Sequence, residues 1–173
     1  ALRVDDPRHD TVHHDTALVE AALIETAFVG ARAVNDPSTI RWVVAAIAEP
    51  ASTGVASIAG RVHPVDRRTD GGVLIRLGPG GRRVRVPLAP GTFATVDVQS
   101  VEPLAFSEPV DLPGGGVLAY DGERTTPVGA DAIITVSIEA SGPRIIDVEA
   151  VLVTAARSQL FDVPPRRKDA HGD

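Results

Sequence analysis

Apolar and polar residues alternate with a period of two over many short runs of the chain, a pattern typical of strands with one buried face. In the run 132–139, Ile134, Val136 and Ile138 fall on one side, while Thr135 and Ser137 fall on the other. Breaks rich in Gly, Pro and Asp separate such runs at intervals of about 8–12 residues. The pattern predicts strands at 2–4, 16–24, 28–34, 72–77, 82–88, 92–101, within 102–111, and at 117–120, 123–126 and 132–139.

Three of the breaks have the composition of turns. Asp5-Asp6-Pro7 predicts a chain reversal close to the N-terminus. The run Gly78-Pro79-Gly80-Gly81 predicts a turn that joins 72–77 to 82–88 as a hairpin. Asp121-Gly122 predicts a second hairpin, because both residue types tolerate the positive φ angles of a two-residue hairpin turn.

Two segments have the period of a helix instead. The segment 37–48 places four apolar residues at the spacing i, i+3, i+4 and i+7: Ile40, Val43, Val44 and Ile47. Asp36 before it has the composition of an N-cap, and Pro50 after it ends the helix. Near the C-terminus, Asp147 predicts the N-cap of a second helix over 148–160.

These elements predict a mainly β fold. Roughly eight to ten short strands with regular turns favour an antiparallel β-sandwich or barrel, and the absence of an alternating βα rhythm argues against a parallel sheet. One inserted helix and one C-terminal helix would complete it. We expect a single β-rich domain over 1–163, followed by a charged, disordered tail over 164–173.

Composition narrows the class of protein. The formal net charge of −6 argues against a nucleic-acid partner. No cysteine is present, which excludes disulfides and thiolate metal sites. No apolar run has the length of a membrane span, so we expect a cytoplasmic protein with no membrane partner. The chain also has no Met, from which we expect that it was cut from something longer.

Small residues dominate the stretch 50–64, which we expect to be a loop between a helix and a strand. Gly54 can adopt positive φ, and the hydroxyls of Ser52, Thr53 and Ser57 can bond a phosphate or a ribose. The alternative is a tight connection in which small side chains only permit close packing. Sequence alone leaves both interpretations open.

The histidines give weaker evidence for a functional site than the small-residue stretch does. His9, His13 and His14 fall close together around the polar run 11–15, but their spacing matches no metal motif, and a solvated turn is the simpler interpretation. His63 could act as a base or simply pack at the start of a strand. We therefore predict no metal site.

Several stretches in order resemble the C-terminal half of the NAD kinase-like superfamily, in particular the ATP-NAD kinase-like branch named for acetoin catabolism. They are Phe28-Val29-Gly30-Ala31-Arg32-Ala33-Val34, Arg61-Val62-His63-Pro64-Val65, Val86-Pro87-Leu88-Ala89-Pro90-Gly91, Gly115 through Arg124, and Ser141 through Glu149. The resemblance implies an antiparallel β-sandwich of the NAD kinase C-terminal domain type. In that superfamily an α/β domain with a Gly-Gly-Asp-Gly-Thr motif comes first. This chain has no such motif, so it resembles the second domain alone.

The resemblance also implies binding residues, with departures. Glu20 matches the Glu of the family's Ala-Leu-Asn-Glu motif, but Val19 stands where the family has Asn and cannot supply its amide. The family's Thr-Gly-Ser-Thr-Ala-Tyr-Ser loop is similar to Ser52-Thr53-Gly54-Val55-Ala56-Ser57, and its Asp-Gly-Gln turn is similar to Asp121-Gly122-Glu123. For Glu20, a bond to ribose hydroxyls or to a metal stays open, as does a strand carboxylate that faces solvent or pairs with an Arg. Asp121 can equally be only the first residue of a turn.

Together these points predict the substrate- or nucleotide-binding and oligomerisation domain of a NAD kinase-like protein. NAD and ATP with Mg²⁺ would be ligands of the complete protein, which we expect to be a homo-oligomer. The domain that holds ATP would lie outside this chain, so the chain alone should be inactive. The nucleotide-binding residues would be Glu20, Ser52, Thr53, Gly54, Ser57, Asp121 and Gly122. A non-catalytic structural or regulatory module that binds protein partners is the alternative.

Overall fold

Two antiparallel sheets make up most of the chain. The computed structural model describes residues 2–8, 11–25, 36–142 and 146–163. The chain divides into two compact units, 1–142 and 143–173. The described residues of the first unit form ten strands: β1 (Leu2–Arg8), β2 (Thr11–Ala17), β3 (Glu20–Ile24), β4 (Ile40–Ala45), β5 (Gly72–Ala89), β6 (Thr92–Leu104), β7 (Val110–Pro113), β8 (Gly116–Tyr120), β9 (Arg124–Val128) and β10 (Ile133–Ile138).

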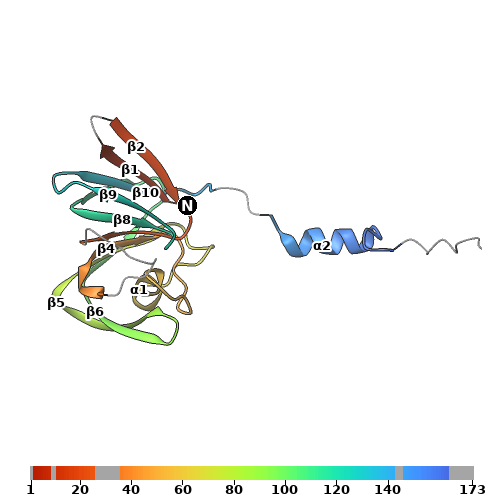
Figure 1. The fold of residues 1–173 in the computed structure, drawn as a ribbon, viewed down its shortest axis with the longest axis horizontal. Helices are drawn as coiled ribbons and strands as arrows, with labels where there is room; N and C mark the ends of the chain where they lie inside the picture. Colours follow the sequence, from red (N-terminus) through yellow and green to blue (C-terminus); the bar gives the residue numbers. More distant parts are fainter. Residues whose placement is uncertain (1, 9–10, 26–35, 143–145, 164–173) are drawn as a thin grey trace, which may run out of the picture. The chain divides into compact units, whose positions relative to one another are not determined.

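The strands form one sheet of six and one of four. The six-stranded sheet has the order β6-β5-β4-β3-β8-β9, and the four-stranded sheet has the order β2-β1-β10-β7 (Figure 1). Every pairing between described strands is antiparallel. The prediction of a mainly β fold with one inserted helix and one C-terminal helix is confirmed in these terms.

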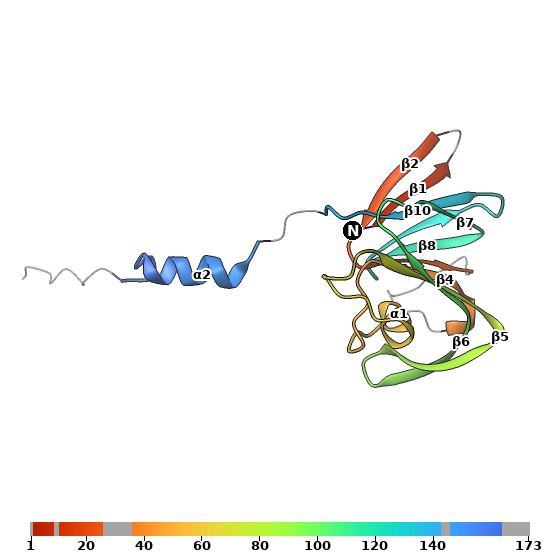
Figure 2. The same cartoon turned by 180° about the vertical axis from the view of Figure 1, so that it is seen from behind.

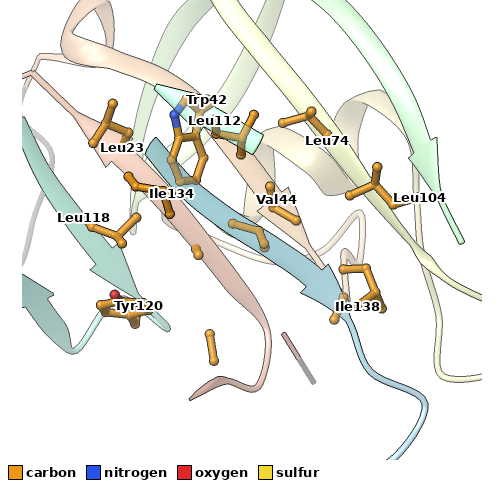
Figure 3. Close-up of a cluster of buried hydrophobic side chains, with 14 of the residues drawn as sticks. Leu23, Trp42, Val44, Leu74, Leu104, Leu112, Leu118, Tyr120, Ile134 and Ile138 are labelled. Atoms are coloured by element: carbon orange, nitrogen blue, oxygen red, sulfur yellow. The ribbon is translucent and has the colours of Figure 1, made fainter. Parts of the chain in front are cut away.

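A hydrophobic core joins the two sheets. Figure 3 shows side chains from β3, β4, β5 and β8 of the larger sheet meeting side chains from β7 and β10 of the smaller one. Trp42 of β4 is the largest side chain in this cluster, and its indole N–H donates to the Pro113 carbonyl oxygen at 3.1 Å. Buried indole nitrogens need such a partner, so this bond fixes the position of the ring between the sheets.

The opposite face of the larger sheet packs on helix α1 (Ala56–Val62). The long strands β5 and β6 bend around this helix, as Figures 1 and 2 show from both sides. Ile58 and Ala59 of the helix are fully buried against Val43 of β4 and Val73 of β5. The helix therefore lies inside a curled sheet, close to the segment that precedes it.

The predicted helix over 37–48 is wrong. Only Pro37–Thr39 forms a single 3-10 turn, η2, with the Asp36 carboxylate accepting from Ser38 N at 2.9 Å as the predicted cap. From Ile40 the chain is strand β4, whose two faces are both buried between the two hydrophobic clusters. A strand buried on both faces is apolar throughout, so it satisfies the helical spacing by chance, and its β-branched residues favour the strand.

The stretch 50–64 is not only a loop, since α1 forms within it. Gly60 shows why small residues are needed there, because a Cβ atom at this position would collide with the Glu49 carbonyl oxygen. The interpretation that small side chains permit close packing is therefore correct for this part of the stretch.

The predicted hairpin between 72–77 and 82–88 is also wrong. The two runs form the single strand β5, and both pair with β6. Leu77 and Arg82 lie opposite the same residue, Val98, so the run Gly78-Pro79-Gly80-Gly81 forms a bulge rather than a reversal. The hairpin turn falls between Ala89 and Thr92 instead.

At the N-terminus the predicted turns are replaced by strands. Asp5-Asp6-Pro7 lies inside β1, and the run 11–15 lies inside β2. The predicted strand 16–24 is divided between β2 and β3 by a break at Leu18 and Val19. The predicted strand 28–34 and the predicted tail 164–173 lie outside the described residues.

Helix α2 (Val148–Arg157) is the regular element of the second unit. The Asp147 carboxylate accepts from Ala150 N at 2.9 Å, which confirms the predicted cap. No residue of this helix is buried. The prediction of a single domain over 1–163 stays a prediction.

Candidate functional site

A cavity of about 410 Å³ opens where the starts and ends of several strands of the larger sheet meet. Its volume is in the range of small-molecule sites. Six of the predicted binding residues line it, from three segments far apart in the sequence. They are Glu20, Ser52, Thr53, Gly54, Asp121 and Gly122.

The β8–β9 turn brings Asp121 to the cavity. Asp121 and Gly122 have φ angles of 52° and 67°, and Glu123 N donates to the Tyr120 carbonyl oxygen at 3.0 Å. Positive φ at both central residues is the signature of the hairpin turn that Asp-Gly predicts. The predicted hairpin between β8 and β9 is thereby confirmed.

The Asp121 carboxylate holds the β2–β3 connection in place. Its Oδ1 atom accepts from Leu18 N at 2.9 Å and Val19 N at 2.8 Å, and more weakly from Glu20 N at 3.3 Å. Asp121 N in turn donates to the Glu20 carbonyl oxygen at 3.0 Å. Asp121 therefore does more than begin a turn, because its side chain determines where strand β3 and Glu20 start.

Glu20 is the most unusual residue of the site. It is 6 % exposed, and it lines the cavity as the first residue of the central strand β3. Burial raises the pKa of its carboxyl to about 7, and the negative charge of Asp121 adds to this shift. A titratable group with a perturbed pKa in a cavity is a candidate functional residue. The solvent-facing alternative for Glu20 is wrong, since the side chain is buried.

The loop before α1 forms the opposite wall. Gly54 has a φ of 79°, and its N–H donates to the Pro87 carbonyl oxygen of β5 at 3.0 Å. This bond fastens the Ser52-Thr53-Gly54 loop to the curled part of the sheet. The side chains of Ser52 and Thr53 make no hydrogen bond with another described residue, so their hydroxyls can bond a ligand.

Ser57 does not line the cavity. Its hydroxyl is buried in α1 and donates to the Gly54 carbonyl oxygen at 2.6 Å, with the Pro87 carbonyl oxygen a further 3.2 Å contact. The Ser57 hydroxyl therefore connects the loop to the first turn of the helix. His63 caps the other end of α1 and is also absent from the lining.

Other lining residues were not predicted. Glu123 and Thr125 follow the hairpin turn at alternate positions, a spacing that could have placed both on one side of the returning strand. Leu88 reaches the cavity only because β5 curls over α1, and no local sequence signal indicates that. Val19, Ile24, Val55, Ala56 and Ala119 complete the lining.

A second cavity of about 370 Å³ lies beside η2 and the β5 bulge, and includes Arg41 and Asp97. None of the predicted site residues lines it. In the part of the chain that is described, no three His, Cys, Asp or Glu residues are grouped so that they could hold a metal ion. No described helix is long and apolar enough to cross a membrane.

Comparison with known sequences assigns the chain to a family. Residues 2–141 match the model of the family described as acetoin catabolism protein X C-terminal domain. The chain belongs to this family. The match includes every segment that lines the first cavity, and it ends before helix α2.

A curated relative is acetoin catabolism protein X of Cupriavidus necator strain H16. It is 36% identical to the chain over 143 residues, which is 80% of this chain and 40% of the relative. The chain therefore spans about two-fifths of the length of the protein it matches. No solved structure is significantly similar to the chain.

Proposed function

We propose that this domain binds the nucleotide or nucleotide-like substrate of a NAD kinase-like protein of the acetoin catabolism protein X type. The observation that supports the proposal is the cavity itself. It unites Glu20 of β3, Thr53 and Gly54 of the loop before α1, and Asp121 of the β8–β9 turn. These segments are the ones that resemble the ligand-contacting motifs of the NAD kinase-like superfamily. An antiparallel sandwich of that superfamily's C-terminal type is part of the proposal.

Size and chemistry fit part of such a ligand. A nucleoside fits a cavity of about 410 Å³. Glu20 offers a buried carboxylate acceptor, and Ser52 and Thr53 offer hydroxyls. A ribose diol would satisfy the carboxylate with two donors.

The fit to ATP with Mg²⁺ is poor. Phosphoryl transfer needs a metal ion and groups that hold the phosphates. The described residues include no cluster that could hold the metal, so we assign no step of phosphoryl transfer to them. In this proposal the domain binds and orients the acceptor, and any groups that hold ATP belong to another part of the protein.

Calorimetric titration of the intact protein with NAD and with ATP tests the proposal. We expect saturable NAD binding that weakens at least tenfold in Glu20→Ala and in Thr53→Val. Glu108→Gln is the matched control, because this carboxylate is exposed and lies outside the cavity. Unchanged affinity in both cavity variants, or no binding of either nucleotide, would refute the proposal.

A second function is favoured by one observation, the exposed apolar surface of helix α2. Val148, Val151 and Leu152 are each more than half exposed. A ten-residue helix without packing is only marginally stable in water. A structural or regulatory module that binds protein partners, including further copies of itself, would use this surface. A full-length protein whose mass in solution is that of a monomer at all concentrations, and which retains no other protein from a cell extract, would argue against this function.

A further inference from the structure

Among the described residues, those that line the first cavity carry negative charge and no positive charge. Glu20, Asp121 and Glu123 all contribute, while the remaining lining residues are apolar, glycine, or hydroxyl-bearing. Phosphate-binding sites in proteins use Arg, Lys or convergent backbone N–H groups. Here the backbone N–H of Gly54 is bonded to Pro87, and those of Val19 and Glu20 are directed at Asp121.

Among these carboxylates, Glu20 alone is buried without a bonding partner. Asp121 accepts N–H bonds from the β2–β3 connection, and Glu123 is exposed. No described residue bonds the Glu20 carboxyl, although the residue is more than nine-tenths buried and faces the cavity. Its oxygens are not among the fully buried polar atoms that lack a partner, so they open onto the cavity, where a ligand that supplies donors can bond them.

Arg124, a described cation that follows the β8–β9 turn, bonds to other groups. Arg124 of β9 bonds the Asp15 carboxylate at 2.6 Å and the Thr16 carbonyl oxygen at 2.6 Å, and its guanidinium lies over the Tyr120 ring. A hydrogen bond to Asp15 and the nearby charge of Asp121 raise the pKa of Arg124, but Arg124 is absent from the cavity lining. The loop 52–56, Leu88 and Ala119 contribute no titratable group to the cavity.

We propose that the cavity takes the donor-bearing, uncharged or cationic part of its ligand, releases a proton from Glu20 on binding, and keeps phosphate groups outside. This inference rests on the proposed function and specifies its substrate class: a sugar diol or a cationic ring enters, and an anionic group does not. An added phosphate inside the cavity would be repelled by the carboxylates that line it.

Proton release follows from the state of Glu20 in the empty site. Its pKa of about 7 means that the carboxyl is largely protonated below neutral pH. A diol donates most strongly to the ionised carboxylate, so binding expels the proton. Affinity should therefore rise with pH, by roughly 30-fold between pH 5.5 and pH 8, and then level off.

The test is calorimetry on the intact protein in two buffers of different ionisation enthalpy, between pH 5.5 and pH 8. The probes are nicotinamide riboside with its monophosphate, adenosine with its monophosphate, and NAD. We expect one nucleoside to bind with the release of close to one proton at pH 5.5, its monophosphate to bind with the same proton release because the phosphate stays outside, and inorganic phosphate not to displace the nucleoside. Glu20→Gln should abolish the proton release, and Glu108→Gln should retain it.

The outcomes distinguish this inference from the proposed function on which it rests. If NAD or a nucleoside binds without proton release in the unmodified protein, or if inorganic phosphate displaces the nucleoside, this inference is overturned and the proposed function stands. If no probe binds at any pH, both are overturned. Because the unmodified protein gives the deciding result, a poorly folded Glu20→Gln variant would not obscure it.

Discussion

Glu20 and Asp121 are neighbouring carboxylates with opposite surroundings. Asp121 accepts several backbone N–H bonds and is a structural link between the β8–β9 turn and the start of β3. Glu20 has no such bonds and is desolvated. This division of roles gives one residue that positions the site and one that is available to a ligand.

Two substitutions of Asp121 should separate the stability that comes from its charge from the stability that comes from its backbone conformation. Asn tolerates the φ of 52° at this position, so Asp121→Asn removes mainly the charge-assisted bonds, at a cost of about 1–2 kcal/mol of unfolding free energy. Asp121→Ala should cost more, because Ala is also strained at positive φ. Denaturant titration measures both. In Asp121→Asn the pKa of Glu20 should fall, since the Asp121 charge helps to raise it. Equal stability of all three proteins would contradict this role for Asp121.

The raised pKa of Glu20 also predicts how stability depends on pH. Its folded-state pKa is about 7 against an ordinary value of 4.5, so the folded state binds the proton more tightly than the unfolded state. Protonation of Glu20 therefore contributes about 3 kcal/mol to the free energy of unfolding. This contribution is fully present below pH 4.5 and is lost as the pH rises through 7. Glu20→Gln should remove this dependence. Parallel curves of unfolding free energy against pH for the two proteins would show that Glu20 is not buried as described.

At the scale of elements, strand β4 shows why a helix was predicted where the structure has a strand. The segment 40–45 is apolar on both faces because it is the third strand of a six-stranded sheet, and one-dimensional periodicity cannot distinguish that from a helix. The strands β8, β9 and β10 were predictable because each is bounded by strong turn residues, and β10 also alternates apolar and polar residues.

The residues of the site, like the strands, were predictable from sequence only in part. Motif resemblance identified Glu20, Thr53 and Asp121, which the fold brings to one cavity. It could not show that the Ser57 hydroxyl is used within the protein, because that depends on β5 curling over α1. Pairings between distant strands decide such details, and short-range patterns do not contain them.

Glycine at position 60 gives a sharp test of the packing of α1. In Gly60→Ala the new Cβ would collide with the backbone carbonyl of Glu49, so we expect a loss of about 2 kcal/mol or more of unfolding free energy. The matched control is Gly129→Ala, where a Cβ meets no atom within 4 Å. Thermal and denaturant unfolding compare the two. A Gly60→Ala protein as stable as the control would contradict the close approach of the helix to the segment 49–50.

At the scale of the whole molecule, two sheets and one enclosed helix hold the cavity walls at fixed positions. The core between the sheets fixes β3 and β8, and the second cluster fixes α1 against β5. The family match covers this whole arrangement, whereas helix α2 lies beyond it. The domain is thus a rigid support for one site to which three separate segments contribute.

Hydrogen exchange of the intact protein with and without saturating NAD tests the central claim most directly. The account predicts slower exchange in the three segments 19–24, 52–56 and 119–125, which contribute to the cavity lining, and no change in the β5 bulge at 78–81, which does not. Protection that leaves all three segments unaffected, while NAD is bound elsewhere on the protein, would contradict the assignment of the cavity as the binding site.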